Sequence, residues 1–129
     1  MANRIDATTS SGPRLLDPDA LAWEDLGVGG ARAEIKPIVT PRESRTFGAG
    51  FARFERTRFD WRLTYDESIH VLDGALEVVH AGATVRASAG QILFLPAGSD
   101  VTYVVPEACR LFYVAYPVDW QERLEAGDA

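Results

Sequence analysis

Two adjacent carboxylates, Asp66 and Glu67, are the side chains of this sequence whose position most suggests chemistry. They follow the alternating stretch 61–65 and lead into the apolar positions Ile69 and Val71. A carboxylate that enters an apolar strand costs free energy unless another group pairs with it or a reaction uses it. The pattern therefore predicts either a structural carboxylate, satisfied by an arginine or backbone donors, or an acid–base group.

Other chemistries have weaker support in the sequence. Cys109 is the single cysteine, so an intrachain disulfide is excluded, and no base stands beside it to activate a nucleophile. It is predicted to be a buried small hydrophobe. No GxxxxGK[ST] loop that cradles phosphates is present, and Lys36 is the single lysine.

The charge and length of the chain limit its partners. At 129 residues it is expected to form one domain, and its net charge of −6 argues against general binding of nucleic acids. Arginine supplies twelve of the 13 basic residues, and six of them lie between positions 42 and 62. This cluster could serve an anionic ligand or a subunit contact, although a solvated strand face is the favoured interpretation. Neither a signal peptide nor a membrane-spanning run is legible, so we expect a cytoplasmic protein.

The pattern of the chain predicts an all-β protein with a short N-terminal helix. Residues 1–14 are expected to form a flexible tail, and residues 15–44 an arm with a helix from Asp17 to Gly27 and an edge strand at 33–39. Short strands separated by turn signals then follow at the spacing of a sandwich or barrel, with turns at 56–58 and at Asp73-Gly74. The barrel is placed at 45–120 and a C-terminal tail at 121–129.

Two segments resemble the motifs of the cupin family. The first is Glu67, two residues, then His70-Val-Leu-Asp-Gly74, and the second is Gly90, five residues, then Pro96-Ala97-Gly98. The resemblance implies a small double-stranded β-helix, or jelly-roll barrel. Within cupins the sequence is most similar to the ethanolamine-utilisation protein Q group, over residues 45–120.

The metal ligands usual in cupins are absent from their positions. Metal-binding cupins supply three histidines and one glutamate, whereas Trp61, Leu63 and Val101 stand where the histidines belong. Glu67 is the one ligand retained, and one carboxylate among apolar side chains is not a transition-metal site. We therefore expect no metal and no cofactor.

The resemblance implies that Trp61 and Glu67 line the barrel. Burial in an apolar wall would raise the pKa of Glu67 toward the working pH, as a general acid–base catalyst requires. Tyr65 and Tyr103 are expected to donate hydrogen bonds to a substrate oxygen, or else to pack and bond the backbone.

Five further residues are expected to bind or surround a small organic substrate: Trp61, Leu63, Arg53, Asp66 and Tyr113. Arg53 shares a strand face with Glu55, so it could clamp an anionic group or pair with Glu55.

Three functional hypotheses remain open at this point. The first is a metal-independent enzyme that isomerises, cyclises or eliminates a small substrate. The second, implied by the resemblance, is an accessory protein of ethanolamine utilisation and its microcompartment, with the acetate kinase activity ascribed to that group. The third is a non-catalytic binding or dimerisation module, and a homodimer through an edge such as 35–39 is expected in any case.

Overall fold

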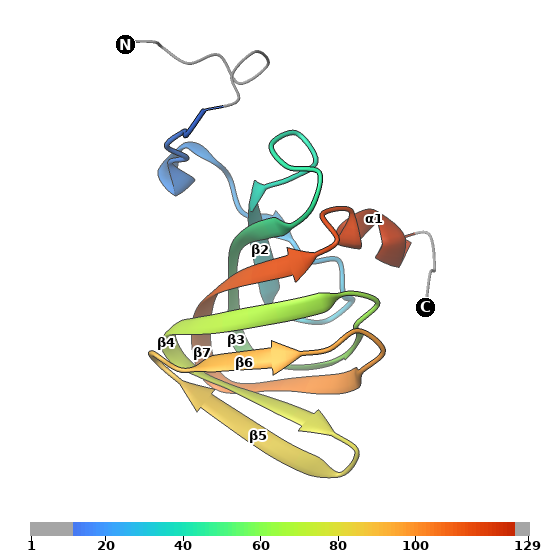
Figure 1. The fold of residues 1–129 in the computed structure, drawn as a ribbon. Helices are drawn as coiled ribbons and strands as arrows, with labels where there is room; N and C mark the ends of the chain where they lie inside the picture. Colours follow the sequence, from blue (N-terminus) through green and yellow to red (C-terminus); the bar gives the residue numbers. More distant parts are fainter. Residues whose placement is uncertain (1–11, 126–129) are drawn as a thin grey trace.

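The computed structural model describes residues 12–125, and in them seven strands form one antiparallel sheet (Figure 1). The strands pair in the order β1-β2-β3-β7-β4-β5, and β6 pairs with β4. Their bounds are β1 Glu24–Asp25, β2 Ala33–Val39, β3 Gly48–Arg62, β4 Asp66–His80, β5 Ala83–Ser88, β6 Ile92–Leu95 and β7 Asp100–Tyr116. A 3₁₀-helix, η1 (Pro18–Ala20), and an α-helix, α1 (Trp120–Glu125), complete the structure. The all-β prediction is confirmed.

Three strands are much longer than the sequence pattern indicates. Turns were expected at 56–58 and at Asp73-Gly74, but β3 and β4 run through both places. Each place is a β-bulge instead, with a register shift between Glu55 and Thr57 and shifts on both sides of Gly74. Arg56 and Gly74 take positive φ values of 43° and 75°. A bulge takes up one extra residue and bends the strand. The residues predicted to form turns therefore bend β3 and β4 instead of ending them.

Gly74 has a packing reason to be glycine. A Cβ built there would lie 2.0 Å from the carbonyl oxygen of Ala108 on β7, whereas one built at Gly82, which has a similar positive φ of +80°, meets nothing within 4 Å. Gly82→Ala should therefore cost about 1 kcal/mol for the backbone conformation alone. Gly74→Ala should cost about 1–3 kcal/mol more, because the β4–β7 pair must separate. Equal urea midpoints for the two variants would contradict this account.

The core lies on the inner face of the bent sheet. Alternate residues of β3, β4 and β7 point inward and are buried, as the period of two requires. The most completely buried large side chains are Tyr65, Leu63, Leu76, Leu111, Val71 and Val105. Cys109 is also buried, and desolvation raises the pKa of its thiol to about 11, in agreement with its prediction as a small hydrophobe.

The helix expected from Asp17 to Gly27 is wrong beyond its first turn. Asp17 caps η1 by accepting from the backbone N–H of Asp19, and Pro18 opens it, but the chain is extended again at Leu21. Glu24 and Asp25 then pair with β2, and the Trp23 ring packs on the outer face of the sheet. Capping residues favour the start of a helix, but a short helix is stable only where tertiary packing stabilises it. Here the packing stabilises an extended chain instead.

The segment predicted as a C-terminal tail, 121–129, is helical as far as Glu125. Helix α1 begins at Trp120, which is 5 % exposed, and lies at the end of the barrel next to the end of β7 (Figure 1). The rest of that predicted tail, 126–129, and residues 1–11 of the N-terminal one lie outside the described residues. Neither helix within residues 12–125 has the length and apolar character needed to span a bilayer.

A carboxyl group in an aromatic cavity

A small cavity inside the barrel brings together most of the residues predicted to carry the chemistry. Its volume is about 30 Å³. Six aromatic side chains, several aliphatic ones and one carboxyl group line it: Phe54, Trp61, Tyr65, Tyr103, Tyr113, Trp120, Leu26, Ile35, Ala52, Ile69, Leu111 and Glu67. The half-exposed members Leu26 and Trp61 mark where the cavity approaches the surface. About 10–15 Å³ suffices for one water, so the space suits a ligand of few atoms.

Glu67 is the one acidic group of this cavity. It stands near the start of β4, where strand alternation turns it inward between Asp66 and Ser68, and it is 8 % exposed. Burial raises the pKa of its carboxyl to about 8, against the opposing effect of a hydrogen bond from Tyr103. At neutral pH the carboxyl group is therefore mostly protonated, yet it can lose its proton within the range in which enzymes work.

The tyrosines form the polar surroundings of Glu67. The Tyr103 hydroxyl donates to Glu67 Oε1 at 3.5 Å, and Trp61 Nε1 donates to the Tyr65 hydroxyl at 2.8 Å. Burial, followed by the charge of Glu67, raises the pKa of Tyr65, Tyr103 and Tyr113 above the ordinary value. All three hydroxyls therefore remain protonated, and each keeps one hydrogen to donate, which Tyr103 directs at Glu67.

Trp120 and Leu26 complete the cavity from outside the barrel strands. The Trp120 ring lies 5.1 Å from that of Tyr65 and 5.6 Å from that of Tyr113, between centroids. Leu26 comes from the segment between β1 and β2. These two and Phe54 were not assigned to the site from sequence, although Phe54 could have been found by continuing the inward alternation of β3.

Two residues predicted to contact substrate lie elsewhere. Leu63 is fully buried in the core, and its backbone bonds with Gly98 and Ser99 outside the cavity. Asp66 is exposed, and its carboxylate accepts from the backbone N–H of Ala97 at 2.8 Å. It therefore holds the start of β4 to the turn after β6.

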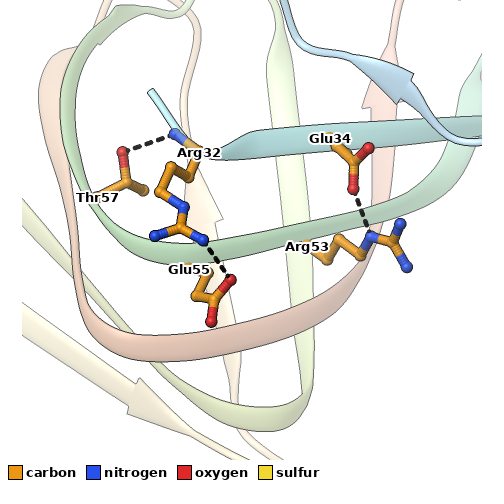
Figure 2. A network of polar contacts seen from close by, with 5 residues as sticks. All are labelled: Arg32, Glu34, Arg53, Glu55 and Thr57. Carbon is orange, nitrogen blue, oxygen red and sulfur yellow. Dashed lines mark hydrogen bonds and ion pairs between the residues drawn. The ribbon is translucent and has the colours of Figure 1, made fainter. Parts of the chain in front are cut away.

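Arg53 also lies away from Glu67, on the outer face of the sheet. Its Nε donates to Glu34 at 2.7 Å, while Glu55 pairs with Arg32 at 3.0 Å. Figure 2 shows the two pairs side by side. The predicted Arg53–Glu55 pair is therefore wrong. Cross-strand register explains why Arg53 pairs with Glu34 and not with Glu55, because Arg53 is directly opposite Glu34.

The outer groove that contains these ion pairs is larger than the barrel cavity, at about 700 Å³. Each of its three arginines is paired with a carboxylate, the third being Arg110 with Asp73 at 2.7 Å. Half-exposed pairs of this kind contribute little to stability and leave no arginine of the groove free to bind an anion without breaking a pair.

The residues at the metal positions do not fit a metal. Trp61 donates to Tyr65, and Leu63 and Val101 are buried in the core, so Glu67 has no second ligand beside it. Within residues 12–125, no group of three or more His, Cys, Asp or Glu side chains is placed to hold an ion. His80 is exposed near a turn, with Nδ1 3.0 Å from the carbonyl oxygen of Asp100.

The jelly-roll barrel and its inward-facing, histidine-free cavity define a cupin without the usual metal ligands. The chain belongs to the family described as ethanolamine utilisation protein EutQ, whose model matches residues 24–122. It is similar to the structure of the Clostridium difficile EutQ protein, with a TM-score of 0.70 and 39 % identity over 75 % of this chain and 71 % of that one. It is also similar to an ethanolamine utilisation protein Q from Salmonella typhimurium, with a TM-score of 0.73 and 33 % identity over 81 % and 85 %.

Two further comparisons bear on function. A curated relative from Clostridioides difficile, named acetate kinase EutQ, is 42 % identical over 66 % of this chain, which spans 54 % of that relative. The curated relative of the same name from Salmonella typhimurium is matched over 37 % of its length. The chain thus spans from about half to just over a third of these relatives. The polyketide cyclase RemF from Streptomyces resistomycificus, at 18 % identity and a TM-score of 0.72, shares the fold.

Proposed function

We propose that this protein is a metal-independent enzyme in which Glu67 moves a proton on a small organic substrate. The observation that supports this most is a single carboxyl group, 8 % exposed, that faces an aromatic cavity instead of a counter-ion. A purely structural carboxylate would be expected to accept several short hydrogen bonds. From the described residues Glu67 accepts one, at 3.5 Å, which is longer than usual for two oxygens.

The roles of the neighbouring residues follow from their position. Glu67 gives or takes the proton, and Tyr103 and Tyr65 donate to a substrate oxygen or hold it in orientation. Trp61, Tyr113 and Trp120 shape an apolar wall that keeps water away from the reacting group. Isomerisation, cyclisation and elimination all require such a proton transfer, so all three stay within the proposal.

Family membership gives this chemistry a context in ethanolamine utilisation, in the cytoplasm or in association with a microcompartment. The curated relatives named after acetate kinase activity are longer than this chain. The barrel cavity gives this activity no support, because none of the described residues that line it is Lys, Arg or His, and phosphoryl transfer depends on positive charge around the phosphates. A non-catalytic binding module is the second candidate, favoured by the small volume of the cavity.

Deuterium exchange tests the proposal without knowledge of the substrate. Small amines, alcohols, hydroxy acids and carbonyl compounds would be incubated with the protein in D₂O and followed by ¹H NMR. An acid–base enzyme should exchange a carbon-bound hydrogen of at least one compound class, and Glu67→Gln should abolish that exchange. Absence of any Glu67-dependent exchange across the panel would favour the binding module.

We further propose that the protein forms a homodimer through the outer face of β6, β4, β7 and β3. Six apolar side chains gather there around Ser68 and His70, namely Phe51, Ile92, Phe94, Phe112, Val114 and Tyr116. Ile92 and Phe94 are 66 % and 64 % exposed, more than a soluble monomer usually tolerates in one patch. Between β3 and β6, the rows through Ser68 and His70 contain no Asp, Glu, Lys or Arg. Asp66, opposite Tyr116, places one carboxylate at the border of the patch, so a second copy can pack on the apolar rows with Asp66 at the rim.

This outer apolar face replaces the strand edge from which a dimer was expected. Strand β2 is paired with β3 along its length and with β1 at Ile35, so its edge is partly covered.

The double change Ile92→Asp and Phe94→Asp should convert a dimer to a monomer in sedimentation velocity at micromolar concentration. Val85→Asp is the control, because Val85 is a strand residue of comparable exposure, 54 %, on β5. A monomeric wild type, or a dimer that survives the double change, would contradict the proposal.

A further inference from the structure

The charged groups of the barrel cavity do not match a carboxylate ligand such as the one in the name of the curated relatives. Glu67 is its one acidic group, and none of the described residues that line it is basic. Three tyrosine hydroxyls remain protonated there because burial and the charge of Glu67 raise each pKa. When Glu67 ionises, the cavity therefore holds one uncompensated negative charge.

The walls of the cavity favour the same sign of ligand. Six aromatic rings line it, and the faces of aromatic rings carry the negative part of their quadrupole. Protein sites that combine aromatic walls with one carboxylate attract organic cations, whose charge interacts with both. When Glu67 is ionised, a carboxylate or phosphate ligand would be repelled by both.

We propose that the barrel cavity binds a small organic ammonium ion, with its N–H groups on the Glu67 carboxylate and its alkyl part against the aromatic wall. This proposal rests on the proposed function of the same site and names its substrate class. The vacant hydrogen-bonding capacity of Glu67 supports it, because one long bond from Tyr103 is the contact that the described residues offer its carboxyl group.

Size sets the second limit on the ligand. A cavity of about 30 Å³ accommodates a few non-hydrogen atoms, as in methylammonium, ethylammonium or ethanolammonium. A longer amine would have to displace Leu26 or Trp61, the half-exposed residues at the mouth. Affinity should therefore fall from ethylammonium to butylammonium, although the longer chain is more hydrophobic.

Binding of the cation must release the proton of Glu67. The pKa of the free carboxyl is raised to about 8 by burial, and the ammonium ion pairs with the ionised form. The other titratable groups that line the cavity, Tyr65, Tyr103 and Tyr113, stay protonated throughout this range. Affinity should accordingly rise about tenfold per pH unit below pH 8, with close to one proton released per ligand.

The test is a calorimetric titration with ethylammonium and ethanolammonium against two matched probes, acetate and ethanol, at pH 6.5, 7.5 and 8.5. We expect saturable binding of the ammonium ions, tighter at each higher pH, and at least tenfold weaker binding of acetate and ethanol. Glu67→Gln should lose the binding and its pH dependence. Glu77→Gln is the control, since Glu77 lies on the same strand but pairs with Arg86 outside the cavity.

Two outcomes would overturn the proposal: acetate or ethanol binding as tightly as the ammonium ions, or ammonium binding that Glu67→Gln leaves unchanged. Failure here is separable from failure of the proposed function. Glu67-dependent deuterium exchange without ammonium binding would reject the ligand class and keep the acid–base role. Ammonium binding at Glu67 without deuterium exchange in any compound would keep the ligand class and reject the acid–base role.

Discussion

The stability of the wild-type protein should fall as the pH rises from about 5 to 8, and Glu67→Gln should remove most of that slope. The folded state keeps the proton of Glu67 up to a pKa of about 8, whereas the unfolded chain releases it near the ordinary value of 4.5. Between these values the folded state binds more protons, so the contribution of Glu67 is fully present below pH 4.5 and is lost as the pH rises through 8.

The expected change in the free energy of unfolding is large for one residue. A single group contributes a slope of up to about 1.4 kcal/mol per pH unit, so a few kcal/mol accumulate between pH 5 and pH 8. Urea unfolding at half-unit pH steps measures it, with Glu77→Gln as the control for charge removal on the same strand. If Glu67 were instead a structural carboxylate, Glu67→Gln would cost about 1–3 kcal/mol at every pH above 5. If the free energies of unfolding of wild type and Glu67→Gln changed in parallel with pH, Glu67 would not be a buried, protonated carboxyl group.

Glu67→Gln should also lower turnover, by about 10²–10⁴, which is the usual contribution of a positioned acid–base group. The amide keeps the shape of the side chain and its hydrogen bonding to Tyr103 but has no titrating proton. The melting temperature at pH 8 should stay equal or rise, because a desolvated charge has been removed. Initial rates of deuterium exchange measure the loss. Unimpaired exchange together with reduced stability would leave Glu67 a structural residue.

Strand alternation made part of the site predictable. Trp61, Tyr65 and Glu67 belong to one inward-facing series around the end of β3 and the start of β4, and Tyr103 faces them from β7. Sequence could place these side chains inside the barrel because one face of each strand must be apolar and buried. It could not give the volume left between them, and Leu63, in the same series, packs into the core instead.

The errors arose where tertiary contacts decide between two local choices. The pattern showed that Arg53 and Glu55 share a face, but not that this face is the outer one. There β2 presents Glu34, and Arg32 lies directly before β2. Helix signals after Asp17 were overridden by pairing of Glu24 with β2. In place of the Asp73-Gly74 turn there is a bulge, because β4 continues its pairing with β7 beyond Gly74, where Ala108 leaves no room for a side chain. Each of these outcomes depends on residues at least ten positions away.

The three tryptophans of the chain are divided between the two sides of the sheet. Trp61 and Trp120 line the cavity, whereas Trp23 lies on the outer face with its ring 4.1 Å from the guanidinium carbon of Arg53 and 4.9 Å from Lys36 Nζ. Indole emission depends on the polarity and charge of its immediate surroundings. Native fluorescence of this protein therefore contains two components that report on the interior and one that reports on the exterior. Replacing Trp23 by Phe would leave a spectrum whose titration follows the Glu67 proton and whatever enters beside it, without an attached dye.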